Sequence, residues 1–255
     1  RMVSAMPSID ENLNSWDKDW GHDGSEWSSA WGTNEAMWRH SVHSRIGRFL
    51  PAGSVLEIAP GRGRMTEFLL PLCQSYVGVD LAAECVKACQ ERFAKQDHAT
   101  FATTSGTELK AVADASIDFA FSWDSLVHAD AAVLRAYVSE LARCLKPGGF
   151  AFLHHSNMHA YFDEASGKVT VENPHWRDTT VSADTVREAC KAAGMHLRVQ
   201  ELLQWSVPHL SDCFSLMQRP LDAGQVGPEL VRFEHPNMTS EMGLARILNE
   251  SYWGG

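Results

Sequence analysis

The chain has 255 residues, of which 44% are hydrophobic and 21% are charged; 32 acidic residues against 22 Lys and Arg give a formal net charge of −10. These proportions are those of a folded globular protein, and they exclude a long disordered chain, a collagen-like fibre and a coiled-coil rod. A nucleic-acid partner is disfavoured, because binding to phosphates requires a basic surface.

No apolar run approaches the roughly 20 residues that a membrane helix needs, and the first ten residues lack the apolar centre of a signal peptide. The six cysteines form no CxxC pair, so we expect reduced, buried thiols rather than a zinc ribbon or a thioredoxin-type site. These features predict a cytoplasmic protein without a membrane segment.

The N-terminal 50 residues are rich in tryptophan and polar residues. Trp16, Trp20, Trp27 and Trp31 recur at partly helical spacing, which predicts a helical segment. Two interpretations stay open: the indoles are buried against the core, or they form a lid whose ring faces stack on a ligand. In the second case Trp20 and Trp31 are candidate substrate-binding residues.

From residue 51 onward, short apolar runs alternate with segments of helical periodicity. Glycine and proline separate these segments, and Lys146-Pro147-Gly148-Gly149 is a strong stop signal after a long amphipathic helix. The alternation predicts an α/β fold with a doubly wound, mostly parallel sheet. The predicted strands are 54–59, 75–80, 100–103, 117–122, 150–154 and 211–217, and the predicted helices are 65–74, 82–94, 131–145 and 182–194.

A turn of small residues, Ala59-Pro60-Gly61-Arg62-Gly63, joins the first of these strands to a helix. Gly61 and Gly63 have no Cβ, so their backbone can approach a ligand closely, and the N-terminus of the helix attracts anionic groups. Asp80 ends the next strand, where a carboxylate can accept hydrogen bonds from both hydroxyls of a ribose. The combination indicates a cofactor that contains a nucleoside.

The turn distinguishes between two classes of nucleoside cofactor. A nicotinamide-binding turn reads GxGxxG, and its third glycine is missing here. Glu57 followed by AxGxG instead resembles the first motif of class I S-adenosylmethionine (SAM)-dependent methyltransferases, an acid followed by GxGxG. Asp80 at the ribose position and the string Leu145-Lys146-Pro147-Gly148-Gly149 before a strand are similar to the same family. The resemblance covers roughly residues 50–155 and continues more weakly to Met217.

The resemblance implies a Rossmann-like fold with a seven-stranded sheet and S-adenosyl-L-methionine as the cofactor. It divides the chain into an N-terminal helical lid at 1–50, a SAM-binding domain at 51–218 and a C-terminal extension at 219–255. The domain carries an insertion at about 156–181. The extension has two open interpretations, a cap over the pocket or the contact of a homodimer.

By position, the resemblance places one set of residues around the methionine end and the sulfonium of SAM, and a second set around its ribose and adenine. The first set is Glu57, Ala59, Gly61, Gly63 and Ser122. The second set is Asp80, Leu81, Ser105 and Gly106. Many family members carry an acid at the Ser105-Gly106 position, so a hydroxyl or a backbone group must replace its contact with the adenine.

The segments after the fourth and fifth strands supply candidate residues for the acceptor pocket. A hydroxyl acceptor needs a base, and histidine is the usual one near neutral pH. We predict His128 and His155 as bases, with Asp124 orienting a histidine, ligating a metal or pairing with a cationic acceptor. Adjacent strand residues face opposite sides, so we expect His155 and Asn157 to face the pocket and His154 to pack within the sheet.

The insertion adds two candidates for substrate contact, Trp176 and Arg177. We expect no metal site, because the HxxxH spacing of His155 and His159 has neither an evident helix nor an identifiable carboxylate partner. The chemistry that follows from these residues is alignment of an acceptor with a methyl donor, and alignment supplies much of the rate.

These residues predict SAM-dependent N- or O-methylation of an amine or hydroxyl on a sugar or aminocyclitol unit of a natural product, with an aminoglycoside-like acceptor favoured by the acidic charge. Such an enzyme belongs to antibiotic biosynthesis. The alternatives are a nicotinamide-dependent oxidoreductase, which lacks its expected Tyr-xxx-Lys pair, and a non-catalytic methyltransferase-like binding module, which predicts a damaged cofactor turn. A protein or nucleic-acid methyltransferase is disfavoured by Ser122-Trp123-Asp124-Ser125, which replaces the Asn/Asp-Pro-Pro-Tyr/Phe pattern.

Overall fold

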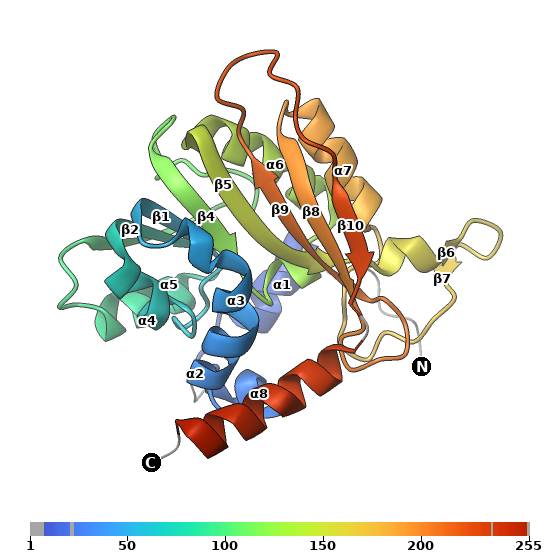
Figure 1. Ribbon diagram of the computed structural model, residues 1–255, viewed down its shortest axis with the longest axis horizontal. Helices are drawn as coiled ribbons and strands as arrows, with labels where there is room; N and C mark the ends of the chain where they lie inside the picture. The colour runs from blue at the N-terminus through green and yellow to red at the C-terminus, as the bar shows by residue number, and fades with distance from the viewer. Residues whose placement is uncertain (1–7, 21–22, 236, 254–255) are drawn as a thin grey trace.

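A central sheet with the strand order β10-β8-β9-β5-β4-β1-β2-β3 forms the middle of the computed structural model (Figure 1), which describes residues 8–20, 23–235 and 237–253. β9 is antiparallel to its neighbours β5 and β8, and the other pairs are parallel. The predicted doubly wound, mostly parallel sheet is therefore confirmed. The strands are β1 (Ala52–Ile58), β2 (Cys73–Asp80), β3 (Ala99–Thr103), β4 (Ile117–Ser122), β5 (Leu145–Ser156), β8 (His196–Leu203), β9 (Asp212–Gln218) and β10 (Val231–Glu234).

The sheet has one strand more than the seven predicted. β10 comes from the C-terminal extension and pairs in parallel with β8, for example Phe233 with Glu201. All four residues of β10 are exposed, and the alternation of apolar and polar residues in Val231-Arg232-Phe233-Glu234 is too short to predict a strand by itself. Its conformation depends on the open edge of β8.

Alternate strand residues point to opposite faces of the sheet, and each face carries its own hydrophobic core. Val55 and Phe152 belong to one core, whereas their neighbours Leu56 and Leu153 belong to the other. The second core packs against α6 (Ala131–Cys144) and α7 (Ala183–Ala192). The first core packs against the N-terminal helical segments, α4 (Thr66–Leu69) and α8 (Met238–Tyr252).

Capping and proline residues determine where the helices begin and end. Asp130 caps α6 by accepting a 2.8 Å hydrogen bond from the N–H of Val133, as expected for an N-cap residue. The helix predicted at 65–74 is shorter, because Pro71 cannot continue the hydrogen-bonding pattern. The remaining elements are α1 (Ile9–Trp16), η1 (Ser25–Trp31), α2 (Asn34–Met37), η2 (Trp38–Val42), α3 (His43–Ile46), η3 (Gly47–Phe49), η4 (Leu70–Leu72), α5 (Ala83–Arg92), η5 (Leu126–His128), η6 (Met158–Tyr161), β6 (Phe162–Asp163) and β7 (Lys168–Val169).

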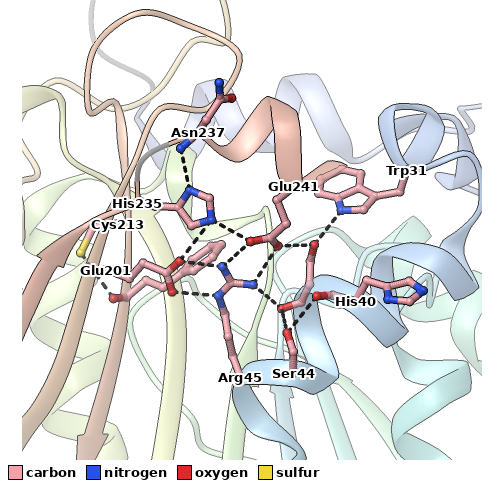
Figure 2. Close-up of polar contacts among 11 residues, drawn as sticks. Trp31, His40, Ser44, Arg45, Glu201, Cys213, His235, Asn237 and Glu241 are labelled. Atoms are coloured by element: carbon pink, nitrogen blue, oxygen red, sulfur yellow. Dashed lines mark hydrogen bonds and ion pairs between the residues drawn. The ribbon is translucent and has the colours of Figure 1, made fainter. Parts of the chain in front are cut away.

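An ion-pair network joins the C-terminal helix to the N-terminal helices and to the sheet (Figure 2). Nε of Arg45 on α3 donates to Glu201 on β8 at 2.8 Å, and Nη2 donates to Glu241 on α8 at 2.9 Å. Nε2 of His235 lies 2.7 Å from Glu241. Glu201, His235 and Glu241 are close enough to ligate a metal ion, but the Arg45 guanidinium already supplies a positive charge to both carboxylates. We therefore interpret the cluster as an ion-pair network.

None of the helices in the described part of the chain has the length and the apolar character needed to span a bilayer.

Candidate active site

A cavity of about 450 Å³ lies at the carboxyl ends of β1, β2 and β4. This volume is in the range of sites that take a small molecule or a cofactor. The strand order β4-β1-β2 places the cavity where the sheet connections diverge to either side, which is the usual ligand position in such sheets. The N-terminal segment covers the cavity with Trp16, Trp20 and Trp27, whose rings contact one another at centroid distances of 5.0–5.7 Å.

The turn after β1 places bare backbone against the cavity. Ala59 and Gly61 have φ values of 57° and 58°, and a Cβ on Gly61 would lie 3.2 Å from the ring of Trp20. Gly63 does not line the cavity, because its Cβ position points at Phe93, 2.9 Å from Cζ. The predicted contact of Gly63 with the cofactor is therefore wrong: this glycine lets the turn pack closely on the end of α5.

Two buried carboxylates lie beside this turn. Asp80 accepts hydrogen bonds of 2.9 Å from the N–H groups of Gly61 and Ala82. These bonds favour the ionised carboxylate, but burial outweighs them and raises the pKa of Asp80 to about 6. Glu57 accepts hydrogen bonds from the hydroxyls of Tyr76 (2.5 Å) and Thr66 (2.7 Å), and burial raises its pKa to about 7. Both side chains line the cavity, and burial raises both pKa values toward neutral pH.

Leu81 and Gly106, which we predict to border the adenine, also line the cavity, but two predicted serines do not. The hydroxyl of Ser105 lies 3.3 Å from that of Thr107. Ser122 is fully buried at the end of β4, and within the described residues its hydroxyl has no hydrogen-bond partner. The expected contacts of Ser105 and Ser122 with the cofactor are therefore not supported, because both side chains lie outside the cavity.

Asp124 forms a fixed carboxylate on the opposite wall of the cavity. Its φ of 54° lies in the left-handed region, which non-glycine residues rarely adopt. The carboxylate lies between Arg64, at 3.2 Å, and Arg177, at 3.4 Å. Although burial opposes ionisation, Arg177 and Arg64 hold the pKa of Asp124 below its usual value. Asp124 is therefore an anion held between two cations.

His154 on β5 supports Asp124 from behind. Its Nδ1 accepts a 3.1 Å hydrogen bond from the N–H of Asp124, and its Nε2 lies 2.8 Å from Asp212. A backbone N–H can only donate, so the ring proton is on Nε2 and is donated to Asp212. Nε of Arg177 donates to the same carboxylate at 3.0 Å. The network therefore runs from the cavity wall into the sheet.

This arrangement reverses the expected orientations of the two adjacent histidines. His155 is fully buried on the other side of β5, where Nε2 lies 2.8 Å from the hydroxyl of Ser215. The prediction that His155 faces the pocket is wrong, because β5 remains extended to Ser156 and strand alternation gives the cavity side to His154.

Asn157 is also a structural residue in this fold. Its side chain donates to the carbonyl of Leu210 at 2.9 Å and accepts from the N–H of Ala183 at 2.8 Å. These bonds anchor the N-terminus of α7, outside the cavity. The predicted substrate contact of Asn157 is therefore wrong.

His128 lines the cavity at the end of η5, next to the ring of Trp16. Its Nδ1 lies 2.9 Å from the carbonyl oxygen of Trp176. A carbonyl can only accept, so Nδ1 carries the proton and Nε2 keeps its lone pair. Burial and the charge of Arg177 lower the pKa of His128 to about 4. At neutral pH the imidazole is therefore uncharged and able to accept a proton.

The cavity brings together the other predicted substrate residues Trp20, Trp31, Trp176 and Arg177. It also includes residues that no sequence motif predicted. Arg64 follows the glycine turn directly, and a cation so close to the motif was a usable signal. Trp123 and Trp205, with ring centroids 6.0 Å apart, follow β4 and β8; the position of β8 beside β9 was not predicted, so Trp205 could not be assigned.

The comparison with known families identifies this part of the chain. Residues 55–149 match the model of a family described as a methyltransferase domain. The match covers less than half of the chain, so it shows that these residues are similar to a methyltransferase domain. S-adenosyl-L-methionine is the cofactor expected for such a domain. Among curated protein sequences, none matches the chain significantly.

Solved structures share the fold of the methyltransferase domain at low sequence identity. The [4+2]-cyclase SpnF has a TM-score of 0.60 and 14% identity, and the alignment covers 85% of this chain and 98% of SpnF. The N-methyltransferase NodS from Bradyrhizobium japonicum has a TM-score of 0.53 and 15% identity, and the alignment covers 70% of this chain and 94% of NodS. A SAM-dependent methyltransferase from Methanosarcina mazei gives 0.52 and 17%, with 69% and 97% covered.

The backbone and side chains that line the cavity fit the groups of SAM. Bare backbone at Gly61 permits close approach, and the buried carboxylates of Asp80 and Glu57 accept hydrogen bonds from hydroxyl and ammonium groups. Asp80 would hold the ribose, Glu57 would face the methionine end and Leu81 would border the adenine. When bound, SAM supplies an activated methyl group.

Proposed function

We propose that this protein transfers a methyl group from SAM to a hydroxyl or amine on a sugar or aminocyclitol unit of a natural product. The observation that carries the proposal is the state of His128. This ring lines the cavity, donates from Nδ1 to Trp176 and keeps Nε2 available. A base with this geometry suits a hydroxyl, because Nε2 would accept the hydroxyl proton. SAM, when bound, would supply the methyl group and would leave as S-adenosylhomocysteine when its sulfur–methyl bond breaks.

The aromatic walls support a ring-shaped acceptor. Trp27, Trp123 and Trp205 line the cavity, and indole faces pack well on the apolar faces of sugar rings. Trp176 is 75% exposed at the cavity margin, so its side chain is available to a bound acceptor. The net charge of −10 supports a small-molecule acceptor over a nucleic acid.

The test is methyl transfer itself, because the fold is shared with SpnF, a [4+2]-cyclase. The full chain is incubated with SAM and a panel of glycosides and aminoglycosides, and mass spectrometry detects the gain of one methyl group. Calorimetric titration with SAM and S-adenosylhomocysteine is run in parallel. Binding of both nucleosides with a methylated product supports the proposal. Binding without any methylated glycoside or aminoglycoside contradicts it.

A further inference from the structure

Three charged side chains form one wall of the cavity on the acceptor side. We call Arg64, Asp124 and Arg177 the Arg–Asp–Arg wall; all three line the cavity. The distances from Asp124 to the two guanidinium groups, 3.2 and 3.4 Å, exceed the 2.7–2.9 Å that is usual for charge-assisted hydrogen bonds. The three groups are therefore gathered at one place without satisfying one another fully.

Arg64 in particular keeps donor capacity. A guanidinium has five N–H donors, and the hydrogen bonds of Arg64 within the described residues are the one to Asp124 and one of 3.4 Å to the hydroxyl of Ser28. Arg177 is held more firmly, with Nε 3.0 Å and Nη2 2.8 Å from Asp212. The wall therefore offers donors from Arg64 and an acceptor from Asp124.

The Arg–Asp–Arg wall and the two residues behind it, His154 and Asp212, carry no net charge in total. Arg64 and Arg177 contribute two positive charges, and Asp124 and Asp212 contribute two negative charges. His154 adds none, because its single ring proton is on Nε2. An ammonium group placed against the wall would lie close to two guanidinium groups, and a carboxylate would lie close to Asp124. Each ion would also face the opposite charge, but because the charges of the wall and Asp212 sum to zero, the ion gains no net attraction that offsets its loss of water.

An uncharged diol fits these groups. A hydroxyl both donates and accepts, so one hydroxyl can donate to Asp124 while its neighbour accepts from Arg64. The rings of Trp123 and Trp205 line the same side of the cavity and are suited to the C–H face of a sugar ring.

We infer that Arg64, Asp124 and Arg177 determine acceptor specificity by binding adjacent hydroxyls of an uncharged sugar ring. The inference rests on the proposed function and narrows it, because it favours a neutral sugar over a cationic aminocyclitol. His154 and Asp212 act as positioning residues: they hold Asp124 in the left-handed conformation that turns its carboxylate to the cavity. Residues kept in sparsely populated backbone conformations cluster at functional sites.

The test compares three acceptors of different charge: a neutral methyl hexopyranoside, its 2-amino analogue, in which an ammonium replaces one hydroxyl, and its uronic acid, in which a carboxylate replaces the hydroxymethyl group. Methyl transfer is measured with the full chain and SAM, and binding is measured by tryptophan fluorescence with the S-adenosylhomocysteine-loaded protein. We expect kcat/KM for the neutral glycoside to exceed both others by about tenfold or more. Preference for the amino sugar or the uronic acid overturns the inference but leaves the proposed methyl transfer intact. Failure of all three to bind or react overturns both.

Two variants with opposite changes of charge test the wall directly. Asp124→Asn removes the anion, and asparagine tolerates the positive φ of this position. We expect the ratio of kcat/KM for the neutral glycoside to that for the uronic acid to fall about tenfold. Arg64→Gln removes a cation, so we expect the neutral-to-amino preference to fall instead. Asp114→Asn and Arg187→Gln are matched controls, since their side chains are 77% and 52% exposed outside the cavity.

A structural role alone would lower the rates with all three acceptors in proportion, and this result from either variant overturns the inference. Circular dichroism and SAM binding identify a variant that fails to fold. In that case the other variant decides, because the two charge changes predict opposite shifts in preference.

Discussion

The backbone N–H of Asp124 donates a 3.1 Å hydrogen bond to Nδ1 of His154. This contact orients a residue of the cavity wall and, at the same time, fixes the imidazole proton on the nitrogen that faces Asp212. A fully buried carboxylate is thereby linked to the wall of the cavity.

Asp212→Asn should lower the free energy of unfolding by about 3 kcal/mol at pH 7, because it removes one partner of a buried ion pair and leaves Arg177 undercompensated. Despite burial, Arg177 and His154 hold the pKa of Asp212 well below its usual value of 3.8. A lowered pKa stabilises the fold above pH 4, and this stabilisation is lost as the pH falls further. The free energies of unfolding of the parent and the variant, measured in urea, should therefore differ at pH 7 and should differ less at pH 3. If Asp114→Asn lowers the free energy of unfolding by the same amount, loss of the buried ion pair does not explain the effect of Asp212→Asn.

His128→Gln should reduce kcat for a hydroxyl acceptor by about 10²- to 10⁴-fold, the usual contribution of a general base, while SAM binding stays unchanged. The pKa of His128 is lowered to about 4, so at saturating SAM the rate of the parent enzyme should fall only as the pH approaches 4. Stopped assays over pH 4–9 measure this. His159→Gln, an exposed residue outside the cavity, is the control. Equal rates for both variants would remove His128 as the base.

Asp80→Asn should weaken SAM binding by about 10- to 100-fold, since hydrogen bonds to a charged group are worth 1.5–3 kcal/mol. Burial raises the pKa of Asp80 to about 6. As the pH falls through 6, the carboxylate is protonated and no longer accepts these bonds as an anion. The affinity of the parent protein should therefore decrease below pH 6, whereas that of the variant should change less. Calorimetry at pH 5, 6, 7 and 8 tests this. Glu57→Gln separates the contribution of the other acid, whose pKa is raised to about 7.

Gly63→Ala should lower the free energy of unfolding by about 3 kcal/mol, from a left-handed backbone and overpacking against Phe93 together. Gly167→Ala is the matched control, because φ is also positive (66°) but no atom lies within 4 Å of the added Cβ. It should cost only about 1 kcal/mol. Gly63→Ala/Phe93→Leu should recover part of the difference. If the two single variants unfold alike, close packing is not the reason for glycine at position 63.

Arg45→Met should destabilise the protein by about 3–5 kcal/mol, because it leaves the carboxylates of Glu201 and Glu241 facing each other without their shared cation. Despite burial, Arg45 lowers the pKa of Glu241 to about 2, so the stabilisation by Glu241 is lost as the pH falls from 4.5 to 2. Hydrogen exchange should increase first in α8. Arg187→Met, which breaks an exposed pair of 3.4 Å, should change stability by less than about 1 kcal/mol.

Several parts of the site were predictable because they depend on local rules. Gly61 and Asp80 were found because a tight turn and a strand end each favour particular residues, and parallel strands bring their carboxyl ends to one edge. His155 was misplaced for a reason that is also local: the orientation of every residue after a strand depends on where the strand stops, and β5 continues to Ser156. A shift of one residue exchanges the two faces.

The sequence by itself determined the sheet class, the cofactor turn and the position of the acid that follows it, since each rests on contacts between residues near in the chain. The tertiary structure alone decided that Arg64, Asp124, His154, Arg177 and Asp212 meet in one network. These residues come from five separate segments, and only packing of the sheet, the turn and the insertion brings their charges within hydrogen-bonding distance. The pairing of β10 was decided in the same way, because an exposed segment becomes a strand only when a partner edge is available.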